Sequence, residues 1–339
     1  MKFVVKRGGK KLELNNKEET LVAVKKNGGD LIYASKELRD DKDVVMEAVK
    51  ENGYALQFAS ERLKADKYVV MVAIKNRRYA LKYASERLKN DKDFILEAVS
   101  ERGSALKFAS EEIQNDKDVV LEAIKNNCYA LQFASERLLN DKDVILQALK
   151  EDGLALEFVS DEMKNDKEVV LEAVKQYGYA LYYASEELRG DKEVVLTAIK
   201  KYGSALQFAS ERLQNDKEVV LEAVKNKGYA LYYASDELRG DKEVVLEAVK
   251  EDSSALRFAS EELKNDKDVV LGAVKQNGYV LQYASESLKN DKDFMLEAVK
   301  ENGSALEFAS DELKTEIIKN IKTKTDKKIE KEKGTSLRL

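Results

Sequence analysis

The chain has 339 residues, among them 59 Lys and Arg, 64 Asp and Glu, one Cys and no His, Pro or Trp. Without His it lacks the commonest general base and the commonest metal ligand, and with one Cys it cannot form an internal disulfide. These absences predict a protein that is not an enzyme, that needs no cofactor, metal or small-molecule substrate, and that folds in a reducing compartment such as the cytoplasm.

Residues 1–15 are the first predicted segment, an N-terminal cap. Two short apolar runs, Lys2–Val5 and Lys11–Leu14, flank a Gly-Gly turn, which is typical of a β-hairpin. The segment carries five Lys or Arg and one Glu, for a net charge of +4. A hairpin that covers the first repeat is one interpretation, and a disordered basic arm is the other.

Residues 16–315 consist of twelve copies of a 25-residue repeat without insertion or deletion. We number the copies as repeats 1–12 and count positions from the Asp that opens each copy, so that repeat 9 is Asp216–Gly240. Lys fills position 2, Ala position 8, Leu position 16 and Ser position 20 in every copy. A fixed period of this length is typical of a solenoid, in which each repeat is stable only against its neighbours.

The first half of the repeat predicts an α-helix. Apolar residues at positions 4, 5, 6, 8 and 9 span an arc of roughly 200° on a helical wheel, which is typical of a helix packed on two sides. An Asn or Asp before position 1 and an acidic residue at position 3, as in Asn165–Glu168, indicate a capping box at the start. Gly at position 13, present in nine copies, predicts a left-handed residue that ends the helix.

The second half of the repeat predicts another helix, because positions 14, 15, 16, 18 and 19 lie in one apolar arc. Position 22 would fall within that arc but is Glu, Arg or Ser in every copy. We therefore expect this helix to end near position 20, where Ser185, Ser210 and Ser235 would cap a short turn. One continuous helix from position 14 to position 24 is the alternative. The sequence thus predicts an all-α fold, an α-solenoid of twelve helix-pair repeats.

The repeats carry an uneven charge and alternate in character. The net charge of −5, with +4 at each end of the chain, leaves −13 in the repeats, which argues against nucleic acid lying along them. Position 14 alternates between Tyr and Ser over Tyr229, Ser254, Tyr279 and Ser304, so the higher-order period is about 50 residues. Duplication in pairs and different surroundings of alternate repeats are both compatible with this period.

The tyrosines are the candidate binding residues. Positions 14 and 18 lie on the apolar arc, so we expect the tyrosines there to be buried in the core. Position 17 lies outside this arc, so Tyr182 and Tyr232 should be exposed, as is typical of protein interfaces. Tyr177 and Tyr202, at position 12, complete the candidate protein-binding surface. Single surface aromatics without a function are the alternative.

Two short motifs and the C-terminal segment complete the chain. Arg189–Asp191 and Arg239–Asp241 spell Arg-Gly-Asp, which integrins bind, but here the Asp opens a helix, which favours a structural role. Residues 316–339 carry a net charge of +4. Their beginning continues the repeat pattern and predicts a closing helix, whereas Lys322–Leu339 is predicted to be a disordered basic tail.

The repeat D-K-[DE]-V-V-L-x-A-V-K-x-x-G-x-A-L-x-[FY]-A-S-x-x-L resembles the repeat called domain of unknown function 4116, and the resemblance covers all twelve copies. It implies an all-helical tandem-repeat protein, of a kind that occurs in protists, algae, giant viruses and bacteria that live inside eukaryotic cells, sometimes as secreted effectors. The family has no established activity, so the resemblance implies no functional residue. Its members often carry Pro after the Ser of position 20, and this chain does not.

These features favour a repeat scaffold that binds protein along an extended helical surface. One alternative is a self-assembling filament or lattice, in which the basic ends contact an acidic body. Another is an effector that binds a host protein after delivery by a non-classical secretion route. We expect a protein partner or self-association, no nucleic acid, and no membrane span, because no apolar run approaches 18 residues.

Overall fold

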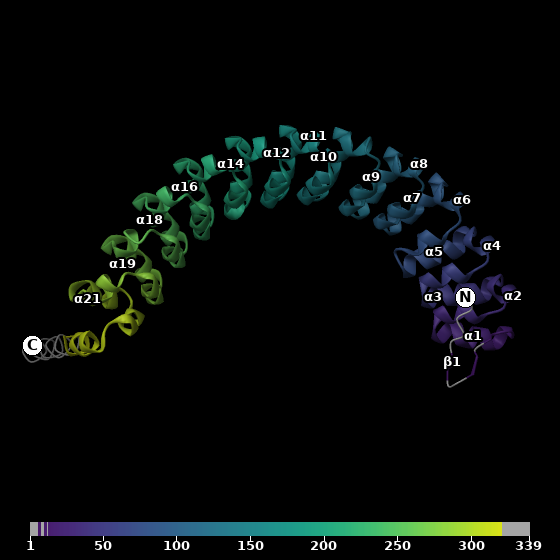
Figure 1. The fold of residues 1–339 in the computed structure, drawn as a ribbon, viewed down its shortest axis with the longest axis horizontal. Helices are drawn as coiled ribbons and strands as arrows, with labels where there is room; N and C mark the ends of the chain where they lie inside the picture. Colours follow the sequence, from purple (N-terminus) through teal and green to yellow (C-terminus); the bar gives the residue numbers. More distant parts are fainter. Residues whose placement is uncertain (1–5, 8–9, 12, 321–339) are drawn as a thin grey trace, which may run out of the picture. The chain divides into compact units, whose positions relative to one another are not determined.

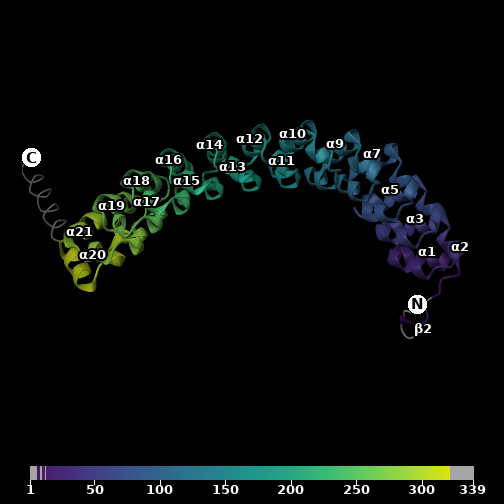
Figure 2. The ribbon, with the colours of Figure 1, turned by 45° about the horizontal axis from the view of Figure 1, so that its top comes forward.

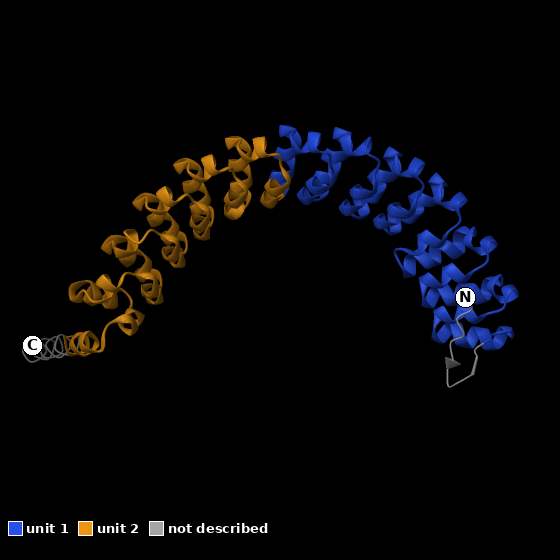
Figure 3. Cartoon of the chain, viewed as in Figure 1, with its two compact units in different colours: residues 1–176 blue, residues 177–339 orange. Residues whose placement is uncertain are grey.

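The computed structural model describes residues 6–7, 10–11 and 13–320. It divides into two compact units, Met1–Gln176 and Tyr177–Leu339, which Figure 3 colours separately. The boundary falls inside repeat 7, directly after its first helix. Each unit is a stack of helical repeats, so the predicted α-solenoid fold is confirmed in both.

Each repeat begins with a ten-residue α-helix over positions 2–11, as predicted. In the described residues these helices are α1 (Lys17–Lys26), α3 (Lys42–Glu51), α5 (Lys67–Asn76), α7 (Lys92–Glu101), α9 (Lys117–Asn126), α10 (Lys142–Glu151), α12 (Lys167–Gln176), α14 (Lys192–Lys201), α16 (Lys217–Asn226), α18 (Lys242–Glu251), α19 (Lys267–Gln276) and α21 (Lys292–Glu301). Their constant length follows from the fixed period of the sequence, because each copy supplies the same start signal and the same stop.

The N-cap of the first helix is the residue of position 1, one residue later than the capping box predicts. In repeat 7, Asp166 and not Asn165 accepts hydrogen bonds from the N–H groups of Glu168 at 3.0 Å and Val169 at 3.1 Å. An Asp side chain in this position satisfies two of the amides that the first turn leaves without an intrahelical partner. The residue of position 1 is therefore the N-cap, and the residue of position 25 has another role.

The second helix is a 3-10 helix of six residues over positions 13–18 in most repeats, where an α-helix was predicted. These segments are η1 (Gly28–Tyr33), η2 (Gly53–Phe58), η3 (Ala80–Tyr83), η4 (Gly103–Phe108), η5 (Cys128–Phe133), η7 (Gly153–Phe158), η8 (Gly178–Tyr183), η9 (Gly203–Phe208), η10 (Gly228–Tyr233), η11 (Ser253–Phe258), η13 (Gly278–Tyr283) and η14 (Gly303–Phe308). With three residues per turn, positions 13, 16 and 19 share one side of this helix, and positions 14 and 17 share another. An α-helical wheel therefore does not predict correctly which side chains of this segment are buried.

The predicted break at position 20 is confirmed, and a third, short helical segment follows it. These segments are α2 (Lys36–Arg39), α4 (Glu61–Lys64), α6 (Glu86–Lys89), α8 (Glu111–Gln114), η6 (Leu138–Asn140), α11 (Asp161–Lys164), α13 (Glu186–Arg189), α15 (Glu211–Gln214), α17 (Asp236–Arg239), η12 (Leu263–Asn265) and α20 (Glu286–Lys289). Ser185 and Ser235 cap them as predicted, by accepting the N–H of position 23 at 3.2 Å, but Ser210 makes no capping bond. Each repeat thus holds three helical segments instead of a pair.

Two layers of helices make up each unit. In unit 2, α14, α16 and α18 lie side by side in one layer, and the 3-10 helices η8 to η11 form the other (Figure 1 and Figure 2). The core lies between the layers, where Val219, Val220 and Leu231 have no exposed surface. Position 6, predicted to be buried, is only half-buried from repeat 4 onward, as at Leu246.

Close packing, and not a left-handed backbone, favours glycine at position 13, although repeats 3, 5 and 10 carry Arg78, Cys128 and Ser253 there. The residue that ends the first helix is extended, as at Asn52 with φ −143° and Asn277 with φ −151°, and neither Gly53 nor Gly278 has φ in the left-handed region, so the predicted left-handed helix end is wrong. A Cβ atom added to Gly203 or Gly228 would lie 2.6 or 2.5 Å from the carbonyl oxygen of position 8 in the next repeat, Ala223 or Ala248. Glycine therefore allows the 3-10 helix to contact the backbone of the following α-helix.

Two short strands precede the first repeat. β1 (Lys6–Arg7) and β2 (Lys10–Lys11) pair antiparallel, with Lys6 opposite Lys11. The paired residues are nearer to the Gly-Gly turn than the apolar runs from which the hairpin was predicted. The predicted strand Lys2–Val5 lies outside the described residues. Leu14 is buried, and its carbonyl accepts the N–H of Ser35 at 2.9 Å. In later repeats the Ser of position 20 donates the same bond to the residue at position 24 of the repeat before it. Leu14 therefore does for repeat 1 what a preceding repeat does for the others.

A closing helix follows repeat 12, as predicted. Residues 311–320 are helical without the break that separates other repeats, and the side chain of Ile317 is fully buried. Lys292 pairs with Glu316, which occupies position 1 of a thirteenth copy. The predicted tail Lys322–Leu339 lies outside the described residues. No helix in the described part of the chain is long and apolar enough to span a membrane.

Candidate protein-binding faces

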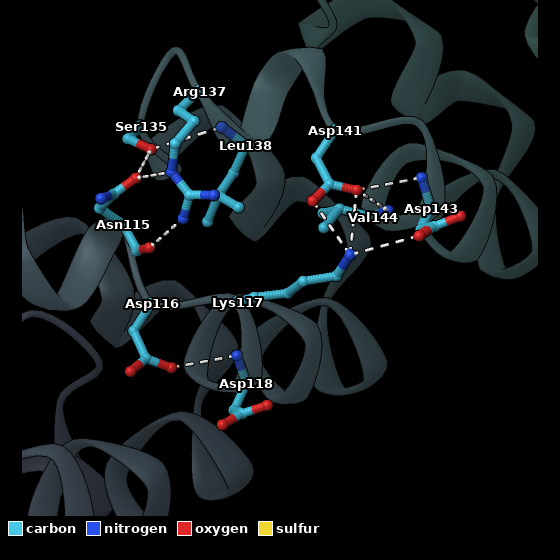
Figure 4. Close-up of polar contacts among 10 residues, drawn as sticks. All are labelled: Asn115, Asp116, Lys117, Asp118, Ser135, Arg137, Leu138, Asp141, Asp143 and Val144. Atoms are coloured by element: carbon cyan, nitrogen blue, oxygen red, sulfur yellow. Dashed lines mark hydrogen bonds and ion pairs between the residues drawn. The ribbon is translucent and has the colours of Figure 1, made fainter.

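A ladder of ion pairs joins successive repeats within each unit. The ammonium group of the Lys at position 2 lies 2.6–3.0 Å from the position-1 carboxylate of the next repeat. Figure 4 shows one step, in which Lys117 lies 3.0 Å from Asp141 and 3.5 Å from Asp143. Because Asp141 also caps α10, one carboxylate both starts a helix and attaches it to the preceding repeat. This double role explains why Lys and Asp recur together.

The ladder predicts how stability depends on pH. The hydrogen bond from Lys67 holds the pKa of Asp91 below its ordinary value of 3.8, and hydrogen bonds to Asp116 and Asp118 raise the pKa of Lys92 above 10.5. A lowered Asp pKa stabilises the fold above pH 3.8 and is lost as the pH falls through the folded-state value. A raised Lys pKa stabilises it below pH 10.5 and is lost as the pH rises through its folded-state value.

We therefore expect the thermal midpoint to be nearly constant between these two limits and to fall on either side of them. Circular dichroism melts over a pH series measure this profile. A midpoint that stays unchanged when the carboxylates are protonated below about pH 3 would contradict a stabilising role of the ladder.

A second set of bonds joins the short helical segments. Ser135 Oγ donates to Asn115 Oδ1 at 2.6 Å, and Arg137 donates to Asn115 Oδ1 and to its backbone carbonyl at 2.8 Å each (Figure 4). The same serine accepts the N–H of Leu138 at 3.4 Å. The residue of position 25 was predicted to be the N-cap of the first helix. It instead accepts hydrogen bonds from the Ser of position 20 and the Arg of position 22 in the next repeat.

The two Arg-Gly-Asp motifs lie within this framework. Asp191 and Asp241 are the N-caps of α14 and α18, and the glycines before them end α13 and α17. Asp241 is also paired with Lys217 at 2.8 Å. Gly190 has no side chain to accept a bond, and Arg212 donates to its backbone carbonyl at 2.6 Å, as Arg137 does to that of Asn115. The predicted structural role of these aspartates is confirmed.

Aromatic rings line the surface of the 3-10 layer in unit 2. Tyr179 lies 5.5 Å from Phe208 and Tyr229 lies 5.1 Å from Phe258, ring centre to ring centre and edge to face. Each pair joins position 14 of one repeat to position 18 of the next. These rings are half-buried, so the prediction that positions 14 and 18 belong to the core is wrong. The partner of a position-14 Tyr is a Phe in most such pairs, in step with the 50-residue alternation, although Tyr54 pairs with Tyr83 at 6.3 Å.

Position 17 carries the most exposed rings of this surface. Tyr182 is 58% exposed and Tyr232 is 51% exposed, which confirms the predicted exposure. Each of them rests on the phenylalanine of the next repeat: Tyr182 lies 5.3 Å from Phe208 and Tyr232 lies 5.1 Å from Phe258. The rings are therefore held in place although they face solvent.

The two tyrosines of position 12 join the same surface. Tyr177 lies 5.6 Å from Tyr179, whose ring lies 4.5 Å from that of Tyr202. A hydrogen bond with Tyr202, together with partial burial, raises the pKa of Tyr179 to about 12, so its hydroxyl stays protonated at neutral pH. We call the set Tyr177, Tyr179, Tyr182, Tyr202, Tyr229 and Tyr232 the tyrosine face. The four predicted site residues all lie on it.

A hollow of about 340 Å³ adjoins the tyrosine face at its later end. Tyr232 and Phe258 line one part of it, and Arg239, Arg257 and Lys264 line another. The guanidinium of Arg257 lies 4.4 Å from the ring centre of Phe258, a cation–π distance. Asp236 and Glu261 also line the hollow and pair with Arg239 and Lys264, so it combines an apolar wall with charges of both signs.

A comparison with protein-family models relates the repeats to a known family. The model described as "Domain of unknown function (DUF4116)" matches residues 16–64, 66–114, 93–139, 116–158, 141–189, 191–239, 241–288 and 268–314. The chain belongs to the DUF4116 family. The matches each span about two 25-residue repeats and begin in both odd- and even-numbered copies. No curated protein matches the chain.

The DUF4116 repeats of this chain contain one thiol, that of Cys128. Burial raises the pKa of the Cys128 thiol to about 11, so the thiol is protonated at neutral pH. In the described residues no group of three His, Cys, Asp or Glu side chains could hold a metal ion. Position 21 is the first residue of the short helix in most repeats and is Glu or Asp from repeat 2 onward. Proline and acidic residues both suit that place.

Sequence analysis missed two features of the DUF4116 surface. One is the Lys–Asp ladder, although the invariant Lys of position 2 was a visible signal for it. The other is a group of cations in repeats 3 and 4, at Arg77, Arg78, Lys82, Arg102 and Lys107, which lies on the 3-10 side of unit 1. The sequence does indicate this group, because Arg or Lys replaces the Asn of position 12, the Gly of position 13 or the Gln of position 17 that neighbouring repeats carry.

Proposed function

We propose that the chain is a non-enzymatic repeat scaffold that binds a protein partner through the tyrosine face of unit 2. The observation that carries this proposal is the row of ring-supported tyrosines, with Tyr182 and Tyr232 more than half exposed. Tyr presents a large apolar ring with few rotatable bonds and a hydroxyl that keeps its hydrogen bonds, and it is enriched at binding hot spots.

The rigidity of the tyrosine face supports binding over a purely structural role. Tyr182 and Tyr232 contact the rings of Phe208 and Phe258, so little rotamer freedom remains to be lost when a partner packs on them. The hollow beside Tyr232 gives a partner side chain a place to insert. A flat face with an adjoining pocket is the usual anatomy of a hot spot.

The repeats themselves supply a matched test. Gln occupies position 17 in four copies, at Gln57, Gln132, Gln207 and Gln282. The variant Tyr182→Gln/Tyr232→Gln therefore uses a residue that the repeat tolerates. We expect it to retain its thermal midpoint and to bind its partner about tenfold more weakly or worse, because each hot-spot tyrosine contributes at least about 1 kcal/mol.

The control is Tyr68→Asp in unit 1. Tyr68 is 64% exposed, and position 3 is Asp or Glu in the other repeats. Titration of the full chain against a partner captured by the wild type, followed by biolayer interferometry, compares the three proteins. Equal binding by the wild type and by the double variant would refute the assignment of this face.

A further inference from the structure

Five exposed cations gather on the 3-10 side of unit 1, and none of them belongs to the tyrosine face. They are Arg77 and Arg102 at position 12, Arg78 at position 13, and Lys82 and Lys107 at position 17. The repeats before and after them carry Asn at position 12 and Gln at position 17. The fold therefore does not require positive charge at these positions, and it occurs here in an array whose net charge is negative.

These cations are not neutralised by their neighbours, unlike the Lys residues of the ladder. Within the described part of the chain, none of the five forms an ion pair with a carboxylate, although Arg102 donates to the backbone carbonyl of Lys75 at 3.2 Å. Two acidic residues of the same repeats have other partners: Glu101 pairs with Lys75 at 2.9 Å and Glu86 with Lys89 at 2.8 Å. The positive charge of the cluster therefore faces solvent.

Aromatic rings hold three of the cations in place. Arg78 lies 4.7 Å from the ring centre of Tyr79, Lys82 lies 4.6 Å from that of Tyr83, and Lys107 lies 5.6 Å from that of Phe133. The rings are half-buried. A cation that already rests on a ring loses less freedom when it binds an anion than a free Lys or Arg does.

We propose that this basic patch, Arg77, Arg78, Lys82, Arg102 and Lys107, binds an acidic peptide segment of a partner protein. An Arg guanidinium can donate two parallel hydrogen bonds to one carboxylate, and the two Lys add point charges beside the Arg groups. This site lies on a different unit from the tyrosine face and does not rest on the function proposed above.

The same observations favour peptide over single-stranded nucleic acid. Nucleic acid would need free ring faces on which its bases stack, and here Lys82 and Lys107 lie over the rings. The patch covers two repeats, each adding about 8–10 Å, and the repeats on either side carry uncharged Asn and Gln at positions 12 and 17. A phosphate backbone that continued along the array would leave this positive charge, whereas a short acidic peptide fits within the patch.

The repeats again supply the variant. Arg77→Asn/Lys82→Gln/Arg102→Asn/Lys107→Gln gives repeats 3 and 4 the residues that repeats 2 and 5 carry at these positions. Binding is measured by fluorescence anisotropy of a short fluorescein-labelled peptide rich in Asp and Glu, with the full chain and at low salt. We expect the wild type to bind and the variant to bind at least about tenfold more weakly, with an unchanged circular dichroism melt.

A control variant removes the same number of charges from unit 2. It replaces by Gln four exposed lysines near the ends of α14, α16 and α18: Lys200, Lys201, Lys225 and Lys250. We expect it to bind the peptide within about threefold of the wild type. An equal loss in both variants, or no peptide binding by the wild type, would overturn the proposal. So would tighter binding of a labelled oligothymidine that the patch variant abolishes.

Discussion

Replacing Gly228 by alanine is expected to lower the free energy of unfolding by about 1–3 kcal/mol, the usual cost of forcing an atom into a filled site. The added Cβ would lie 2.5 Å from the carbonyl oxygen of Ala248 and 2.9 Å from the Cβ of Asp252. Both atoms belong to the next repeat, so the 3-10 helix would have to move away from α18. Denaturant unfolding followed by circular dichroism measures the change.

The matched control is Gly303→Ala at the same position of repeat 12. No atom lies within 4 Å of the Cβ that this change would add, because no complete repeat follows. We expect the control to be neutral or to stabilise the chain by up to about 1 kcal/mol, since alanine restricts the unfolded chain more than glycine does. If both variants lost the same stability, a backbone requirement for glycine would explain position 13 and contact with the next repeat would not.

The second large effect is expected at the N-cap of the first helix. Asp216 accepts the N–H groups of Glu218 at 3.1 Å and Val219 at 3.2 Å, and it also lies 2.8 Å from Lys192 of the preceding repeat. Asp216→Ala removes both interactions. We expect a loss of about 1–2 kcal/mol, at the upper end of the range for N-caps because the ion pair is lost as well. The shift of the denaturation midpoint measures it.

Glu218→Ala separates the two contributions. Glu218 contacts the same lysine at 2.9 Å, but its side chain is 70% exposed and it caps nothing. A loss below about 0.5 kcal/mol is expected, as for other exposed ion pairs. If Glu218→Ala destabilised the chain as much as Asp216→Ala, the ion pair and not the cap would hold the repeats together.

The sequence predicts best those features whose signals lie within one repeat. The first helix follows from its apolar positions and constant length, and the break at Ser185 and Ser235 follows from the polar residue of position 22. The exposure of Tyr182 and Tyr232 also follows, because position 17 is outside the apolar arc on either kind of helical wheel.

Features that depend on the next repeat could not be predicted in this way. A six-residue segment is too short for its apolar pattern to distinguish a 3-10 helix from an α-helix, so Tyr179 and Tyr229 were assigned to the core. From the sequence alone, Gly228 is equally compatible with a left-handed turn. Only its contact with Ala248 of the next repeat shows that packing is the reason for glycine. The cations of repeats 3 and 4 form a patch only because stacking places the same positions of two repeats side by side.

The most direct test of the central claim places a photo-crosslinking amino acid, p-benzoylphenylalanine, at Tyr182, with a second protein carrying it at Tyr68 as the control. The account predicts that irradiation in lysate of the source cells gives, from position 182 only, an adduct between the 38.3 kDa chain and a different protein. Adducts of equal yield from both positions, or adducts that contain only copies of the chain, would contradict it, and the latter would favour a self-assembling array.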